Sequence, residues 1–297
     1  MQQTTGIIRK GVGGSYTVEV ANALYICKAR GIFRKEGLKP LPGDRVLIRI
    51  QNQGDHILEE ILPRRNCLLR PTIANVDRIF LLASLDEPKP NLLLIDKMTA
   101  IAQLKGIETV LVLTKTDLGC PDVILEIYQK AGIPCLALCT LSSDLAGSIP
   151  ALAALLEGRV SVFTGNSGVG KSTLLNRLEP SLALETNAIS NKLGRGRHTT
   201  RHVELFPLLG GYVADTPGFS SLELDATQEI QKEDLPYGFL EFLPHLGHCR
   251  FSSCTHVRDQ GCAILAAVER GEIHPSRHAS YATLYEGLKD VQAWQMK

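Results

Sequence analysis

One short segment, residues 165–172 (GNSGVGKS), constrains the fold of this chain more than any other. It fits the pattern G-x-x-x-x-G-K-[ST], directly follows the apolar run 160–163, and continues into residues 174–176 (LLN) as the start of a helix. In this context glycines let backbone N–H groups wrap phosphates, and the helix N-terminus adds the positive end of its dipole. Lys171 is expected to neutralise the β- and γ-phosphate oxygens, and the Ser172 hydroxyl to hold Mg²⁺. The pattern therefore predicts a nucleotide-binding site.

A second motif supports a triphosphate ligand. Asp215-Thr216-Pro217-Gly218 ends the apolar strand predicted at 212–214, about fifty residues after the phosphate loop. In a D-x-x-G motif of this kind the carboxylate joins the magnesium shell and the glycine N–H meets the γ-phosphate.

A third motif indicates the base. Thr114-Lys115-Thr116-Asp117 follows the strand predicted at 110–113 and resembles N-K-x-D with Thr in place of Asn. A carboxylate at Asp117 can accept from guanine N1–H and the 2-amino group together, whereas adenine leaves it unpaired. The Lys115 stem is expected along the base plane, and Thr114 is the one departure from the motif. Ser142 stands where a base-contacting loop would follow.

The order of these motifs is unusual. Ordinary GTPases place the phosphate loop first, whereas here the guanine-like motif precedes it. This is a circularly permuted order, so the segment after Gly218 leads directly into the C-terminal region. A γ-phosphate-dependent change there can be transmitted to the last domain.

Three regions are predicted, with boundaries at 1–70, 71–225 and 226–297. The central region alternates strands and helices, which predicts a largely parallel α/β sheet. Its strands are expected at 78–83, 109–113, 135–138 and 160–163, and its helices at 92–104 and 123–131.

The N-terminal region has short β segments at 6–8, 16–20, 24–27 and 46–50, separated by turn residues. They predict a small barrel of the OB-fold type, with an SH3-like barrel as the alternative. Residues 1–70 contain twelve Lys and Arg against six Asp and Glu. This positive charge suits a segment that meets phosphate backbones.

The C-terminal region has helical patterns around a cysteine and histidine cluster. Cys249, Cys254, His256 and Cys262 supply three thiolates and one imidazole, which complete a closed tetrahedral Zn²⁺ shell. His245 and His248 are alternatives to His256. One structural zinc would supply much of the folding energy of this small region.

Together these features resemble the ribosome small subunit-dependent GTPase family over nearly the whole chain. The resemblance includes residues 70–77 (RPTIANVD), 196–200 (GRHTT) in the first-switch position, and the cysteine and histidine cluster. It implies an N-terminal OB-fold, a central permuted P-loop GTPase domain and a C-terminal zinc domain. It also implies GTP hydrolysis that is stimulated by the 30S particle, rRNA binding, and a role in late maturation of the small subunit.

The residues expected to bind GTP are Thr114, Lys115, Thr116, Asp117, Gly165, Asn166, Ser167, Gly168, Val169, Gly170, Lys171, Ser172, Thr173, Asp215 and Gly218. Thr199 or Thr200 is expected to join Ser172 on Mg²⁺. His198 is the candidate for orienting the attacking water, because Phe219 stands where many GTPases carry a glutamine. The alternative is that His198 belongs to an rRNA-contacting stripe with Arg195, Arg197 and Arg201.

The expected partners are GTP or GDP and the 30S subunit with its rRNA, and the expected state is a cytoplasmic monomer. The start of the chain lacks an export-signal pattern, and no apolar run is long enough to span a membrane. Two other functions stay open: a P-loop kinase or ATPase that acts on a small molecule, and a nucleic-acid-binding module whose nucleotide site only switches.

Overall fold

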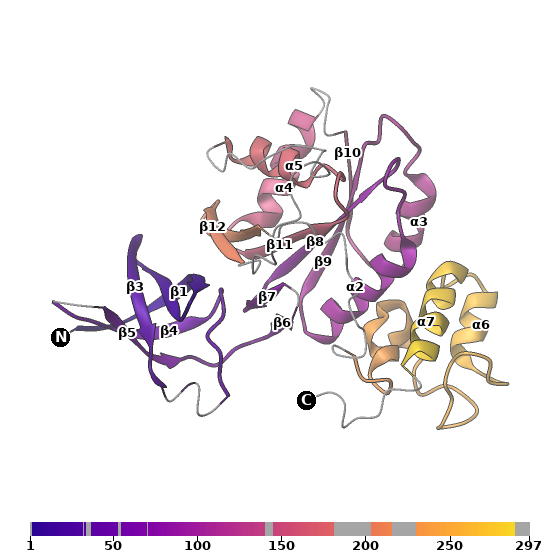
Figure 1. The fold of residues 1–297 in the computed structure, drawn as a ribbon. Coiled ribbons are helices and arrows are strands. Elements are labelled where there is room, and N and C mark those ends of the chain that lie inside the picture. Colours follow the sequence, from indigo (N-terminus) through magenta and orange to yellow (C-terminus); the bar gives the residue numbers. More distant parts are fainter. Residues whose placement is uncertain are drawn as a thin grey trace, which may run out of the picture. The chain divides into compact units, whose positions relative to one another are not determined.

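The computed structural model describes residues 2–31, 33, 37–52, 55–69, 71–139, 145–180, 203–215 and 230–288 (Figure 1). Contacts divide the chain into two compact units. The first comprises Met1–Arg78, Ile149–Phe163 and Leu175–Pro217, and the second comprises Ile79–Ser148, Thr164–Leu174 and Gly218–Lys297. Among the described helices, none has the length and apolar character needed to cross a membrane.

A closed five-stranded barrel begins the first unit. Its strands are β1 (Gln2–Val12), β2 (Ser15–Val20), β3 (Ala23–Ala29), β4 (Arg45–Ile50) and β5 (His56–Ile61). Strand β1 pairs antiparallel with both β2 and β4, β3 runs parallel to β5, and β4–β5 completes the ring. The predicted barrel of the OB-fold type is confirmed. Strand β5 was not among the predicted segments, because its adjacent charged residues interrupt the alternation of apolar and polar side chains.

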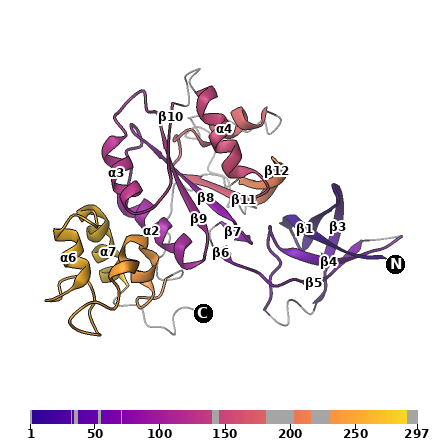
Figure 2. The ribbon, with the colours of Figure 1, turned by 180° about the vertical axis from the view of Figure 1, so that it is seen from behind.

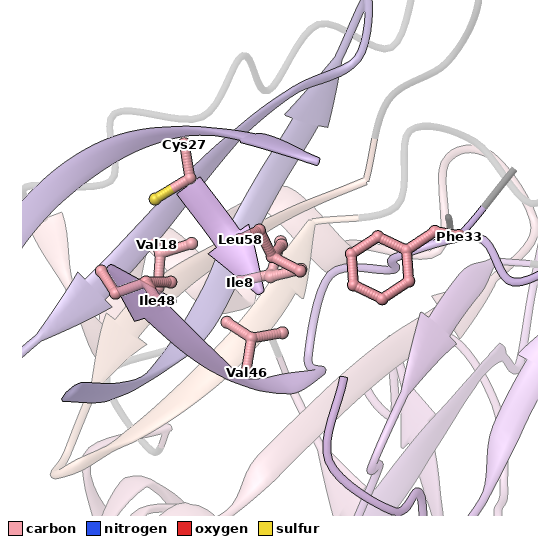
Figure 3. Close-up of a cluster of buried hydrophobic side chains, with 7 residues drawn as sticks. All are labelled: Ile8, Val18, Cys27, Phe33, Val46, Ile48 and Leu58. Carbon is pink, nitrogen blue, oxygen red and sulfur yellow. The ribbon is translucent and has the colours of Figure 1, made fainter. Parts of the chain in front are cut away.

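The barrel is closed around a compact apolar core (Figure 3). Seven buried side chains fill it: Ile8, Val18, Cys27, Phe33, Val46, Ile48 and Leu58. In β2, β3 and β4 alternate residues pack into this core, as a period of two requires. Burial raises the pKa of the Cys27 thiol to about 11, so Cys27 serves as a neutral core residue.

A polar junction follows the barrel and the hairpin of β6 (Cys67–Leu69) and β7 (Thr72–Ala74). The Asn75 side chain donates to the carbonyl of Gly43 and accepts from the N–H of Arg65, both at 2.9 Å. The Asp77 carboxylate accepts from the N–H of Val160 at 2.8 Å and pairs with Arg65 at 2.8 Å. Within the first unit, the 70–77 motif therefore ties the barrel to the strand that leads into the phosphate loop.

The remaining strands of this unit are β11 (Val160–Gly165), β12 (Glu204–Leu208) and β13 (Gly211–Asp215). Strand β13 runs parallel to β11 and antiparallel to β12. Strand β12 also meets the barrel, where Lys10 pairs with Glu204 across β1 and β12 at 2.5 Å. Helix α4 (Leu145–Leu156) lies between β10 and β11 in sequence.

The second unit contains the strands β8 (Arg78–Ser84), β9 (Glu108–Thr114) and β10 (Cys135–Leu138) in the order β10-β9-β8. Strands β9 and β10 are parallel. The helices are α2 (Leu92–Leu104), α3 (Asp122–Lys130) and the start of α5 (Lys171–Leu178). The Asn91 side chain caps α2 by accepting from the N–H of Leu94 at 3.1 Å. The predicted alternation of strands and helices is confirmed.

The C-terminal part of this unit is helical, as predicted. It contains the 3-10 helices η4 (Leu235–Gly238) and η5 (Leu240–His245) and the helices α6 (Ala263–Glu269) and α7 (Pro275–Gly287). Figures 1 and 2 show α7 beside α2 from both sides.

A buried charge network holds α7 against α2. Arg277, which is 1% exposed, pairs with Asp96 at 2.7 Å and with Glu241 at 2.6 Å. The Tyr128 hydroxyl also donates to Asp96 at 2.7 Å. Removing one partner of such a network leaves a buried charge without its counter-ion. The loss of stability is then far larger than the net contribution of the intact network.

We predict that Arg277→Leu lowers the free energy of unfolding of this unit by about 3–5 kcal/mol, because it leaves the carboxylates of Asp96 and Glu241 buried without their cation. Chemical denaturation measures the loss of unfolding free energy, and hydrogen exchange of the α2 and α7 amides shows whether it falls on this unit. The matched control is Arg270→Leu, since Arg270 is an exposed arginine that pairs with Glu272. An equal denaturant midpoint for the wild-type protein and Arg277→Leu would contradict the prediction.

Candidate functional site

The phosphate loop connects the end of β11 to the start of α5. At Gly165 a Cβ atom would come within 2.5 Å of the Leu82 carbonyl oxygen, so a side chain there would displace the neighbouring strand. Gly170, just before Lys171, has a φ of 91°, a conformation that L side chains rarely adopt. Between them Val169 is 2% exposed and anchors the loop in the core. The loop thus requires glycine for close packing at Gly165 and for its backbone conformation at Gly170.

Thr114 links the guanine-like motif to this loop. It is the last residue of β9, it is fully buried, and its hydroxyl donates to the Val169 carbonyl at 2.7 Å. The carbonyl of Ala83 lies farther away, at 3.4 Å. A hydroxyl has one proton to donate, so the shorter contact to Val169 dominates. Thr114, which stands where the motif usually has Asn, therefore bonds to the phosphate loop through its side chain.

The next residues of the motif turn outward. Lys115 has a φ of 56° and its Nζ donates to the carbonyl of Glu87. The Asp117 side chain is exposed and accepts from the Cys139 thiol, with 3.1 Å between Oδ1 and Sγ. Cys139 was not singled out as a site residue by its sequence. The available signal was its place directly after β10, since neighbouring parallel strands end at the same sheet edge.

The second unit therefore brings the predicted phosphate loop and guanine-like motif together. The side chain of Asp215 is not described, and its backbone ends β13 in the first unit. Several predicted residues lie outside the described part of the chain: Ser142, Arg195, Arg197, His198, Thr199, Thr200, Arg201 and Gly218.

The four predicted zinc ligands also come together in space. The ligand atoms of Cys249, Cys254, His256 and Cys262 all lie within 4.8 Å of one another. The Cys249 Sγ is 3.4 Å from His256 Nδ1 and 4.0 Å from Cys262 Sγ. Ligands of a tetrahedral Zn²⁺ ion are about 3.5–3.8 Å apart, given the usual Zn–S and Zn–N bond lengths. The cluster is therefore compatible with a zinc site.

The surroundings of the cluster hold its ligands in place. The backbone N–H of Ala263 donates to Cys249 Sγ at 3.3 Å, and the His256 carbonyl lies 2.8 Å from His278 Nε2. Of the alternative ligands, His245 lies near Glu272 at 3.5 Å, and neither it nor His248 belongs to the cluster.

The protonation of the cluster depends on whether a cation is bound. Burial raises the pKa of the Cys254 thiol to about 12 and raises that of Cys262. Burial lowers the pKa of His256, which keeps its imidazole neutral and able to donate a lone pair. Without a cation these thiols hold their protons, whereas a bound Zn²⁺ stabilises thiolates.

A phosphate loop between strand and helix, bonded to a guanine-like motif that comes earlier in the chain, defines the class of circularly permuted P-loop GTPases. Two family models match the chain: "RsgA GTPase" over residues 61–225 and "RsgA N-terminal domain" over residues 5–58.

Curated relatives match over nearly the full length. A protein of Ruminiclostridium cellulolyticum is 42% identical, with 98% of this chain and 96% of the relative covered. One of Carboxydothermus hydrogenoformans is 43% identical, with 95% and 97% covered. Both carry the name "Small ribosomal subunit biogenesis GTPase RsgA".

Two solved structures are similar throughout. One is YloQ, described as a circularly permuted GTPase, with 33% identity, a TM-score of 0.78, and coverage of 98% of this chain and 96% of that chain. The other is YjeQ from Thermotoga maritima, with 33% identity, a TM-score of 0.80, and coverage of 98% and 100%. The chain belongs to the RsgA GTPase family. The predicted family, fold class and permuted order are confirmed.

We predict that the purified protein contains one equivalent of zinc and that Cys254→Ala loses it, because three ligands no longer close the shell. Cys120→Ala is the control, since Cys120 is an exposed thiol outside the cluster. Metal analysis and hydrogen exchange in α6 and α7 test the prediction. A Cys254→Ala protein that keeps both its zinc and its protected C-terminal amides would contradict it.

Proposed function

We propose that this chain hydrolyses GTP to GDP and phosphate during late maturation of the small ribosomal subunit, with the 30S particle as its stimulating partner. The observation that carries the proposal is the bond from Thr114 to Val169, which joins a guanine-like motif to a phosphate loop. The relatives' names, at 42–43% identity over nearly the whole chain, support the ribosomal role. This role would place the protein in the cytoplasm, and we expect it to act there as a monomer.

The chain's own residues divide the binding of nucleotide between two motifs. Backbone N–H groups of 165–170 and the Lys171 ammonium bind the phosphates, since both carry positive charge toward the oxygens. The Asp117 carboxylate pairs with the two donors of guanine. This division predicts a preference for GTP and GDP over ATP, because adenine offers Asp117 neither of the two donors that guanine offers.

The phosphate end requires a cation as well. Ser172 and either Thr199 or Thr200 would hold Mg²⁺ with help from Asp215, and the ion would offset the charge that develops on the phosphates. Gly218 is proposed to bind the γ-phosphate through its N–H. His198 is proposed to orient the attacking water.

The flanking regions provide the contacts outside the nucleotide site. The barrel belongs to the positively charged segment 1–70, and we propose that it binds rRNA. A single Zn²⁺, held by Cys249, Cys254, His256 and Cys262, would stabilise the C-terminal region without joining in hydrolysis, because its shell has no open position.

Turnover of GTP and ATP with buffer, 30S subunits or 50S subunits tests the proposal. We expect slow GTP hydrolysis alone, faster hydrolysis with 30S subunits and no comparable effect of 50S subunits. Preferred hydrolysis of ATP would indicate a small-molecule kinase or ATPase instead. No turnover with any particle would indicate a binding module.

We predict that Asp117→Asn shifts the preference of the protein from guanine to xanthine nucleotides. Xanthine carries a carbonyl where guanine carries the 2-amino group, so an amide donor suits it where a carboxylate does not. Titration with GDP and xanthosine diphosphate measures the shift. Unchanged affinity for GDP would show that Asp117 is not the reader.

We also predict that His198→Ala lowers turnover at saturating 30S subunits and leaves nucleotide and subunit affinity nearly unchanged. A catalytic imidazole acts on water, whereas a member of an rRNA-contacting stripe acts through phosphate contacts. If His198 belongs to the rRNA-contacting stripe, the affinity of His198→Ala for the subunit falls and the salt dependence of that affinity decreases. Turnover at saturation together with binding at two salt concentrations separates the two roles.

A further inference from the structure

A thiol and a carboxylate meet at the edge of the second unit's sheet. Strands β9 and β10 are parallel, with Leu138 beside Thr114 in register. Cys139 is the next residue after β10, and Asp117 lies three residues after β9. The Cys139 Sγ donates to Asp117 Oδ1 at 3.1 Å. The geometry therefore places a donor on the carboxylate that the proposed function assigns to guanine.

An exposed carboxylate needs such a contact to hold one orientation. Asp117 is exposed, and its two oxygens offer about four acceptor positions. One is taken by the Cys139 thiol, which leaves Oδ2 and the other lone pair of Oδ1 for the two donors of guanine. A side chain already held in its binding orientation loses less freedom when the base arrives, and this raises affinity.

We propose that Cys139 is a positioning residue for guanine recognition, which it serves by orienting the Asp117 carboxylate. The proposal rests on the proposed function of Asp117 as guanine reader. Cys139 is not expected to act on the phosphates, because its contact is with Asp117.

The chain offers a matched control in Cys120. This thiol lies three residues after Asp117 in sequence and donates to a different carboxylate, with 3.0 Å between its Sγ and Asp122 Oδ2. Asp122 begins α3 and has no assigned part in base recognition. The two cysteines thus make the same kind of bond, and only one makes it to the guanine reader.

Calorimetric titration of GDP and ADP against Cys139→Ala, Cys139→Ser and Cys120→Ala tests the proposal. We expect Cys139→Ala to weaken GDP binding about 2- to 10-fold, the usual range for one lost hydrogen bond. ADP binding should stay the same, so the GDP-to-ADP affinity ratio falls. Cys139→Ser should restore the ratio because its hydroxyl also donates, and Cys120→Ala should leave it unchanged. An unchanged ratio in Cys139→Ala, or an equal loss for both nucleotides, would overturn the proposal.

Alkylation of the wild-type chain gives a second test, which does not depend on whether a substituted protein folds. Iodoacetamide labelling read by mass spectrometry should be slowed at Cys139 by GDP and not by ADP, with Cys120 labelled at the same rate throughout. Equal labelling of Cys139 with and without GDP would overturn the proposal.

The Asp117→Asn variant separates this inference from the proposed function. If Asp117→Asn leaves the GDP-to-xanthosine diphosphate preference unchanged, guanine reading by Asp117 fails and the inference fails with it. If the preference shifts while Cys139→Ala keeps the wild-type GDP-to-ADP ratio, only the inference fails.

Discussion

The hydrogen bond from the Thr114 hydroxyl to the Val169 carbonyl is the contact on which the proposed nucleotide site depends. The two residues are 55 positions apart, and each belongs to a motif with its own task. A phosphate loop can bind any nucleoside triphosphate, and a carboxylate alone can bind many donors. Their fixed separation lets one ligand use both, and a buried bond fixes that separation because breaking it leaves a polar group unsatisfied in the core.

Contacts between segments that are distant in sequence also hold the rest of the chain together. Within the first unit, Asp77 joins the end of the barrel segment to Val160 at the start of β11, 83 positions later. Within the second unit, Arg277 of the last helix pairs with Asp96 of α2, 181 positions earlier. The Arg277–Asp96 contact is buried, where an unpaired partner is costly, and the Asp77–Val160 contact is partly buried. Such bonds favour one arrangement of segments that are distant in sequence.

The C-terminal region follows a different principle. Apart from α7 its described helices are short, and α6 has 7 residues. A small region buries too little apolar surface to be stable by that means alone. Two supports compensate: the aromatic cluster of Phe239, Phe242 and Tyr281, and the four converging ligands of the proposed zinc site. The ligand residues lie in the irregular segment between η5 and α6, where Cys262 is the N-cap of α6, so a bound cation would stabilise this segment.

The sequence by itself determined the fold class, the permuted order, the helix at 92–104 and the four residues of the metal cluster, because each depends on local spacing or periodicity. It did not determine the part played by Thr114, which local reasoning regards as a departure from N-K-x-D. Only the tertiary structure decided that the hydroxyl contacts Val169 and that Cys139 contacts Asp117. Strand β5 also became visible only through its partners, since its burial comes from β3 and β4. The physical reason is the same in each case: a side chain's partner across a sheet is set by strand order and register, and neither is encoded in the residues next to it.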